Sequence, residues 1–150
     1  MRDYRYLKFF FVFFLAGFVG LPASALAERM AVNVSSANIR SGPGTDYDVL
    51  WKAERYYPIR ILKKSGGWYK FTDFEGDRGW ISKKVVAKIE CVILRKNGKC
   101  NIRSGPGVEN PILFTVEKGV PFRVLEKKGE WLHVQHADKS KGWIHRGLVW

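Results

Sequence analysis

The sequence lacks most of the features that identify metalloproteins, membrane proteins and enzymes. Its 150 residues include only two cysteines, which are too few for a four-cysteine zinc site or a scaffold of several disulfides. Its apolar run over 9–19 is shorter than the roughly 20 residues that span a bilayer. The chain has no Gly-x-Ser-x-Gly, Walker-type or His-Glu-x-x-His motif. We therefore expect neither an enzyme nor a cofactor.

Acidic residues are scarce relative to basic ones. The chain has 14 Asp+Glu against 26 Lys+Arg, which gives a formal net charge of +12. Such an excess indicates an anionic partner, for example a nucleic acid, a phospholipid head group or an acidic polymer. With 46% hydrophobic and 27% charged residues, the composition is that of a folded domain and not of a disordered tail.

Residues 1–27 are organised like a secretory signal peptide. A basic start, an apolar run and a small-residue cleavage site follow one another: Arg2, Arg5 and Lys8, then 9–19, then Ala25-Leu26-Ala27. The short run favours a cleaved signal, and a membrane anchor is the alternative. The mature chain would begin at Glu28 with a net charge of 23 − 13 = +10.

Export changes the partners that the charge predicts. In the periplasm or outside the cell we expect cell-envelope polymers and not nucleic acid. We expect contact with a membrane only if the signal segment remains uncleaved.

The rest of the chain is a direct repeat. Residues 37–87 and 100–150 share 19 identities in 51 positions without a gap, at an offset of 63. The Asn-Ile-Arg-Ser-Gly-Pro-Gly string of 38–44 recurs in 101–107. This self-similarity predicts a duplicated unit. We place the two units at 28–88 and 89–150, each with a net charge of +5, from 12 − 7 and 11 − 6.

Each unit has the pattern of short β-strands. Apolar and other residues alternate with period two in 57–61 and again in 120–124, as in half-buried strands. Gly-containing segments at 64–67 and 127–130 have the composition of hairpin turns. No apolar stripe at helical spacing occurs after the signal segment. The sequence therefore predicts two small all-β barrels in tandem. The short connection near 86–90 predicts that they pack as a semi-rigid pair.

The string at 38–44, Trp68 and the late Gly-Trp-Ile at 79–81, all repeated in the second unit, resemble bacterial SH3 (SH3b) domains. The resemblance implies SH3-like barrels that act as a non-catalytic binding or targeting module in an exported protein. Such modules often accompany peptidoglycan hydrolases, and some bind peptidoglycan peptides. We therefore expect a ligand such as a peptidoglycan peptide or an anionic wall or lipid polymer. The alternative is an envelope adaptor that binds or regulates another exported protein.

The repeat helps to separate residues that the fold requires from residues with a private role. Trp68/Trp131, Trp80/Trp143 and Trp51/Phe114 recur, which favours packing, with a groove lining as the alternative. Three aromatic residues occur only in the first unit, in or beside expected loops: Tyr47, Tyr56 and Phe74. Exposed loop aromatics often anchor peptides or sugars, so we predict that these three bind ligand. Contact with the second unit is the alternative.

Arg40 and Arg103 hold the same position in the two units. They are candidates for binding an anionic ligand. Hydrogen bonds from the guanidinium to the carbonyls of the neighbouring loop would explain the recurrence equally well, and we favour this bracing role.

The second unit alone contains histidines and cysteines after the signal segment. His133 and His136 are three residues apart, which places them on opposite faces of a strand, and we predict no metal site with His145. Cys91 and Cys100 are nine residues apart. Export favours oxidation, and a bridge across a hairpin at 96–99 would fit. We predict a disulfide and regard a catalytic thiol as the weaker alternative.

Overall fold

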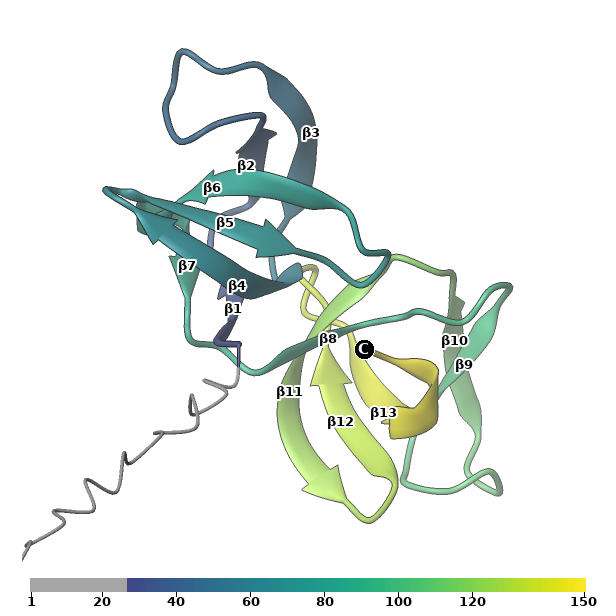
Figure 1. Cartoon of the computed structure of the whole chain (residues 1–150). Coiled ribbons are helices and arrows are strands. Elements are labelled where there is room, and N and C mark those ends of the chain that lie inside the picture. The colour runs from purple at the N-terminus through teal and green to yellow at the C-terminus, as the bar shows by residue number, and fades with distance from the viewer. Residues whose placement is uncertain (1–26) are drawn as a thin grey trace, which may run out of the picture.

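The computed structural model describes residues 27–150 and shows an all-β protein with two sheets, one after the other along the chain (Figure 1). The all-β prediction is confirmed. The predicted signal peptide lies outside the described residues except for Ala27. Within 27–150, no helix has the length and apolar character needed to cross a membrane.

The first sheet is antiparallel and has the strand order β3-β2-β6-β5-β4-β1-β7. Its elements are β1 (Arg29–Val32), β2 (Ser36–Arg40), β3 (Val49–Glu54), β4 (Pro58–Ser65), β5 (Trp68–Thr72), β6 (Arg78–Ser82), the 3-10 helix η1 (Lys83–Val85) and β7 (Val86–Ala87).

The second sheet is also antiparallel and has the order β10-β9-β13-β12-β11-β8. Its elements are β8 (Cys91–Ile93), β9 (Cys100–Arg103), β10 (Ile112–Val116), β11 (Pro121–Lys128), β12 (Trp131–Gln135), β13 (Lys141–His145) and the 3-10 helix η2 (Arg146–Leu148).

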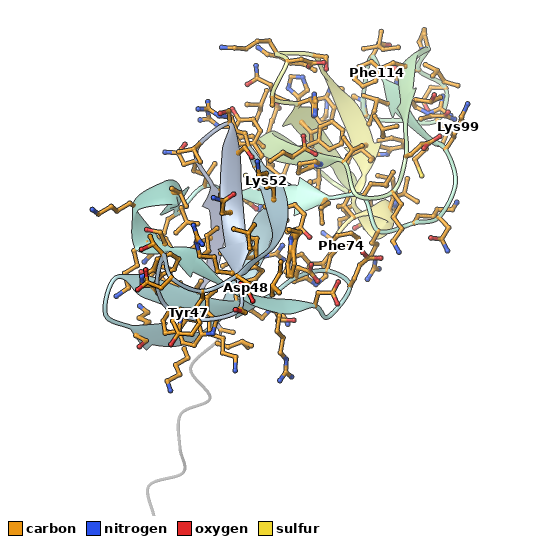
Figure 2. The ribbon with its side chains drawn as sticks, turned by 90° about the horizontal axis from the view of Figure 1, so that it is seen from above. Tyr47, Asp48, Lys52, Phe74, Lys99 and Phe114 are labelled. Atoms are coloured by element: carbon orange, nitrogen blue, oxygen red, sulfur yellow. The ribbon has the colours of Figure 1, made fainter. Side chains whose placement is uncertain are left out.

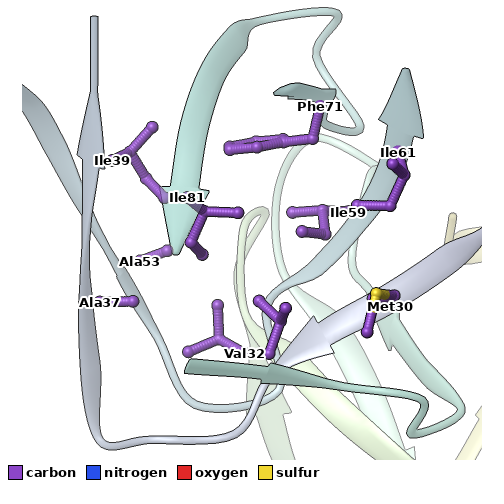
Figure 3. Packing of buried hydrophobic residues seen from close by; sticks show 10 residues of the cluster. Met30, Val32, Ala37, Ile39, Ala53, Ile59, Ile61, Phe71 and Ile81 are labelled. Carbon is purple, nitrogen blue, oxygen red and sulfur yellow. The ribbon is translucent and has the colours of Figure 1, made fainter. Parts of the chain in front are cut away.

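Every strand of the first sheet contributes to one core, so the sheet curls around it (Figure 3). The buried residues are Met30, Val32, Ala37, Ile39, Ala53, Ile59, Ile61, Phe71, Ile81 and Val86. Figure 3 shows Phe71, Ile59 and Ile81 pointing toward one another. Burying such a side chain fully contributes about 1.5–3 kcal/mol.

The second core has large and small side chains at exchanged positions relative to the first core. Ile59 and Phe71 of the first core correspond to Phe122 and Val134, and all four side chains are at most 1% exposed. The aromatic ring has therefore moved from β5 to the counterpart of β4. Such volume-conserving exchanges are tolerated in cores, so two sequences with few identical core residues form one fold.

A missing side chain lets β2 cross β6 in the first unit. Arg40 pairs with Trp80, and a Cβ on Gly79 would overlap Cγ2 of the buried Ile39. In the second unit, a Cβ on Gly142 would overlap Cγ2 of Ile102 in the same way. The late Gly-Trp-Ile motif is therefore a packing requirement.

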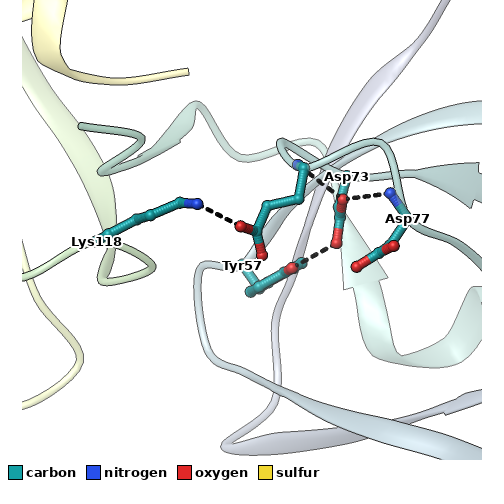
Figure 4. A network of polar contacts seen from close by, with 5 residues as sticks. Tyr57, Asp73, Asp77 and Lys118 are labelled. Atoms are coloured by element: carbon teal, nitrogen blue, oxygen red, sulfur yellow. Dashed lines mark hydrogen bonds and ion pairs between the residues drawn. The ribbon is translucent and has the colours of Figure 1, made fainter. Parts of the chain in front are cut away.

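The two units contact each other through side chains as well as through the chain connection. The ring of the C-terminal Trp150 lies 4.2 Å from the guanidinium of Arg29 and 5.3 Å from that of Arg60. At a second point, the ammonium of Lys118 forms an ion pair with Glu75 (Figure 4). An exposed ion pair contributes about 0–1 kcal/mol and an exposed cation–π contact about 0.5–1 kcal/mol. The packing is therefore specific but modest in energy.

The predicted disulfide between Cys91 and Cys100 is wrong, because both residues are buried free thiols. β8 does not form a hairpin with β9; it pairs with β11 instead. Cys91 lines a cleft of about 470 Å³ between the units, whereas Cys100 belongs to the second core. Burial raises the pKa of Cys91 to about 12, which disfavours the reactive thiolate.

Gly79→Ala tests the requirement for close packing at the strand crossing. We expect this variant to lose about 1–3 kcal/mol of unfolding free energy, because the added methyl group overlaps a fully buried side chain. Gly67→Ala is the matched control, because nothing lies within 4 Å of a Cβ at that turn position. Its effect should stay within about 0.5 kcal/mol. Urea unfolding measures both; equal effects would contradict the proposed cause.

Candidate functional site

Each unit carries the same small pocket at the same place. The first pocket has a volume of about 220 Å³ and the second about 210 Å³. The first is lined by Ser36, Ala37, Asn38, Arg40, Thr45, Trp68, Ser82 and Val85. The second is lined by the eight counterparts at an offset of 63 and by one further residue: Lys99, Cys100, Asn101, Arg103, Val108, Trp131, His145 and Leu148, with Lys96. We call these the twin pockets.

Strand alternation explains how the polar side chains reach the first pocket. Ile39 is fully buried in the core, and its neighbours on β2, Asn38 and Arg40, therefore point to the opposite face. Trp68 begins β5 after a two-residue turn and lies half-buried at the pocket. The same alternation places Asn101 and Arg103 on either side of the buried Ile102.

The two arginines have the bracing role that we favoured. Nη1 of Arg40 donates hydrogen bonds to the carbonyl oxygens of Thr45 and Tyr47, at 3.0 and 2.7 Å. Nη1 of Arg103 donates to the carbonyl oxygen of Asn110 at 2.8 Å. Because a guanidinium has five N–H donors, the same group can hold the loop and still offer donors to a ligand in the pocket.

The rims of the twin pockets differ in charge. Ser36 and Ser82 of the first pocket are replaced by Lys99 and His145 in the second. Lys96 adds a further cation there. The second pocket is therefore better suited to an anionic group than the first.

A larger groove lies elsewhere on the second unit. It has a volume of about 720 Å³ and is lined by Lys99, Phe114, Thr115, Val116, Glu117, Val120, Phe122, His136, Asp138 and Ser140. We call it the second-unit groove. Phe114, Thr115 and Val116 are consecutive in β10, which lies at one end of its sheet, so the groove runs along a strand edge.

In the first unit, Tyr57 takes the place of the groove residue Val120, and Phe74 packs beside it. Tyr57 and Phe74 pack edge to face with centroids 6.3 Å apart, and their counterparts in the second unit are Val120 and Ala137. Tyr57 also packs against the core of its own unit.

A buried carboxylate holds the turn of 73–77 (Figure 4). Oδ1 of Asp73 accepts hydrogen bonds from the backbone N–H groups of Glu75 and Asp77, both at 2.9 Å. Oδ2 accepts the hydroxyl of Tyr57 at 2.8 Å. Burial of the phenol and its hydrogen bond to Asp73 raise the pKa of Tyr57. The turn that contacts Lys118 through Glu75 is thus fixed from inside its own unit.

The three first-unit aromatics do not form one site, and Figure 2 shows Tyr47 and Phe74 well apart. Tyr47 is 48% exposed, but its ring lies against Gly42. Phe74 faces Lys118, whose ammonium lies 5.8 Å from the ring centroid, so it follows the alternative of a contact with the second unit. Tyr56 is half-buried and has a φ of 72°. None of the three lines the twin pockets or the second-unit groove.

The histidines take part in separate contacts. His133 stacks on Trp143 at 4.9 Å between centroids. His145 packs against Trp131, and its Nδ1 accepts the N–H of Gly147. His136 packs on Phe122. Within residues 27–150, no group of three or more His, Cys, Asp or Glu side chains could hold a metal ion.

Sequence reasoning undervalued the residues that recur in both units. Trp68 and Trp131 were assigned by default to packing, and Asn38 and Asn101 were not singled out. The missing signal was available: a polar residue that is identical in both units and adjacent to a core position must lie on the outer face.

The comparisons with known proteins agree with this architecture. The bacterial SH3 domain family matches the chain twice, over residues 33–88 and 96–150. The chain therefore belongs to the bacterial SH3 domain family, and the prediction of tandem SH3b domains is confirmed.

Several relatives are named as cell-wall amidases. Bacillus subtilis YrvJ, named as an N-acetylmuramoyl-L-alanine amidase, is 26% identical over 136 residues, which are 84% of this chain and 26% of YrvJ. Staphylococcus epidermidis LytH, named as a cell wall amidase, is 41% identical over 44 residues, 29% of this chain and 15% of LytH. The chain thus spans about a quarter of YrvJ and less of LytH.

Solved structures show lower similarity. NlpC1 from Trichomonas vaginalis is 15% identical with a TM-score of 0.37, covering 82% of this chain and 45% of that one. An NlpC/P60 family protein from Bacillus cereus is 14% identical with a TM-score of 0.39, covering 82% and 56%.

Tyr57→Phe tests the buried hydrogen bond to Asp73. We expect a loss of about 1–2 kcal/mol at pH 7, because one carboxylate oxygen loses its donor. The raised pKa of Tyr57 also makes wild-type stability depend on pH. The stabilisation is present below the unfolded-state pKa of about 10 and is lost as pH rises above it.

Urea unfolding between pH 7 and 11.5 measures this dependence. The wild type should lose more stability above pH 10 than Tyr57→Phe does. Tyr47→Phe removes an exposed phenol and should retain the wild-type profile. Parallel profiles for the wild type and Tyr57→Phe would refute the buried role of this hydroxyl.

Proposed function

We propose that this protein is an exported, non-catalytic module that binds cell-wall material through its twin pockets. The observation that carries the proposal is the recurrence of one polar and aromatic set, Asn-Arg-Trp, in a pocket of the same size on both barrels. Cell-wall amidases among the relatives of this SH3 chain support a wall ligand. Export follows from residues 1–27 and is part of the proposal, as are the units 28–88 and 89–150.

The chemistry of the pocket favours a short carboxylate-bearing peptide. The guanidinium of Arg40 or Arg103 can bind a carboxylate, and the asparagine amide can both donate to and accept from a peptide bond. The indole of Trp68 or Trp131 offers an apolar face to a side chain or sugar ring. Each pocket is smaller than the about 300–1,000 Å³ typical of drug-sized ligands, so each would hold only a short stretch of a polymer.

Two pockets on one chain suit a repetitive ligand. Once one pocket is occupied, the second meets the same polymer at a high effective concentration, which raises the combined affinity well above that of either pocket. The more cationic rim of the second pocket should make it the stronger site for an anionic group.

Removing the pocket tryptophans tests the proposal. We expect Trp68→Ala/Trp131→Ala to lower retention on purified sacculi at least about tenfold, because tryptophan is a frequent binding hot spot and about 1.4 kcal/mol corresponds to tenfold. Trp131→Ala alone should have a larger effect than Trp68→Ala alone. A co-sedimentation assay at low and high salt measures the bound fraction.

Trp80→Ala/Trp143→Ala is the matched control, because these half-buried tryptophans line neither pocket. Thermal unfolding shows whether each variant is folded. If the wild type is not retained even at low salt, where charge attraction is strongest, or if the control loses as much binding, the proposal fails.

A further inference from the structure

The contact between the units uses different surfaces of the two copies. The first unit contributes Phe74 and Glu75 of its turn at 73–77, and the second contributes Lys118 of its turn at 117–119. Such head-to-tail contacts join unlike surfaces. The counterpart surface of each unit therefore has no place in this contact: 136–140 in the second unit and 54–56 in the first.

The two remaining surfaces are complementary in charge. Lys118 and Glu75, which form the ion pair, correspond to Arg55 and Asp138. Both are exposed, and the Asp138 side chain retains 65% of its accessible surface. Oδ1 of Asp138 accepts two hydrogen bonds from Ser140 and lies 3.2 Å from Nδ1 of His136, which leaves Oδ2 for an arginine. The hydrogen bonds from Ser140 lower the pKa of Asp138 to about 2, so the carboxylate stays charged near neutral pH.

The two surfaces are complementary in volume as well. In the contact between the units, the turn of 73–77 contributes the large residue Phe74, and the turn of 117–119 contributes Lys118 with the small residue Gly119 next to it. In the remaining pair of turns, large and small are exchanged. Ala137 stands where the first unit has Phe74, and Tyr56 stands where the second unit has Gly119. Ala137 stands between His136 and Asp138, which both line the second-unit groove.

Tyr56 occupies a turn conformation that backbone hydrogen bonds fix, since its N–H donates to the carbonyl oxygen of Val32 at 2.9 Å, but that does not call for a tyrosine side chain. Its φ of 72° lies in the left-handed region, where its counterpart Gly119 has a φ of 90°. A bulky residue there is unusual and strained, and glycine would avoid the strain. The ring is half-buried beside the exposed Arg55, whose guanidinium lies 6.0 Å from the ring centroid. Strain of this kind is often retained for a functional contact.

We propose that the second-unit groove binds the turn of 54–56 from a second copy of this chain. Tyr56 of one copy enters beside Ala137 of the other, and Arg55 pairs with Asp138. The contact repeats the head-to-tail geometry that joins the units within one chain, so it produces open linear assemblies and not a closed dimer. The inference does not rest on the proposed wall binding, because Arg55, Tyr56, Ala137 and Asp138 line neither twin pocket; Lys99 lies between the groove and the second twin pocket and lines both.

Charge reversal tests this self-association. In sedimentation velocity experiments the weight-average sedimentation coefficient of the wild type should rise with protein concentration at low salt. Arg55→Glu and Asp138→Arg should each remove that rise. An equimolar mixture of these two variants should associate again, because each supplies the surface that the other lacks. The double variant Arg55→Glu/Asp138→Arg should also recover association.

Three further variants separate the groove from general charge effects. Val120→Tyr/Ala137→Phe places the rings of the first unit in the groove and beside it. This variant should not associate, and thermal unfolding shows whether it is folded. Lys84→Glu and Glu126→Arg reverse exposed charges outside both turns and should associate like the wild type.

Three results would overturn the proposal. The first is a wild type that sediments as a monomer at every concentration, which would leave the groove to a different occupant. The second is association that survives both single charge reversals. The third is a mixture of the two variants that does not associate. Each result can be obtained whether or not the protein binds sacculi.

Discussion

The crossing of β2 over β6 at Gly79 is the constraint on which the rest of each unit depends. Only a glycine lets the fully buried Ile39 pack against that strand. The burial of Ile39 determines which face of β2 points into the core. Because side chains alternate along a strand, Asn38 and Arg40 then point to the outer face. One packing contact therefore places both the core and the polar wall of the pocket, and Gly142 repeats it in the second unit.

Arg40 links the stability of the fold to the chemistry of the pocket. Its Nη1 holds the loop after β2 by two carbonyl oxygens, and the residue also lines the pocket. A substitution there would remove a loop brace together with a ligand donor. This double role explains why the arginine is identical in the two units, whereas the rim residues Ser36 and Ser82 differ from Lys99 and His145. The rim residues do not hold that loop. Ser82 and His145 each accept a backbone N–H of the 3-10 helix that follows, which either side chain can do, so the charge of the rim can differ between the units.

The sequence was sufficient for the fold because the repeat supplied an internal alignment. Alternation and turn composition then indicated short strands, which the structure contains. The disulfide was mispredicted for a physical reason: the spacing of Cys91 and Cys100 suggested a local hairpin, but β8 pairs with β11, which is distant in sequence. Sequence spacing describes local pairing well and long-range pairing poorly. The aromatic residues show the same limit, since only the contact between units reveals that Phe74 faces Lys118.

Duplication in a linear chain has a consequence that neither unit would show alone. Each unit has two surfaces that are complementary to each other. When two units are joined head to tail, one surface of each unit is used in the contact, and the other surface of each unit stays exposed. In the first unit the turn of 73–77 is stabilised by Tyr57 and Asp73 and serves the contact between units. In the second unit the same positions lack that phenol and that buried carboxylate, and a groove is present. The turn of 73–77 is thus supported from inside by the ring of Tyr57. At the corresponding turn of 136–140 the smaller Val120 leaves an opening, which is the groove that we propose a second copy enters.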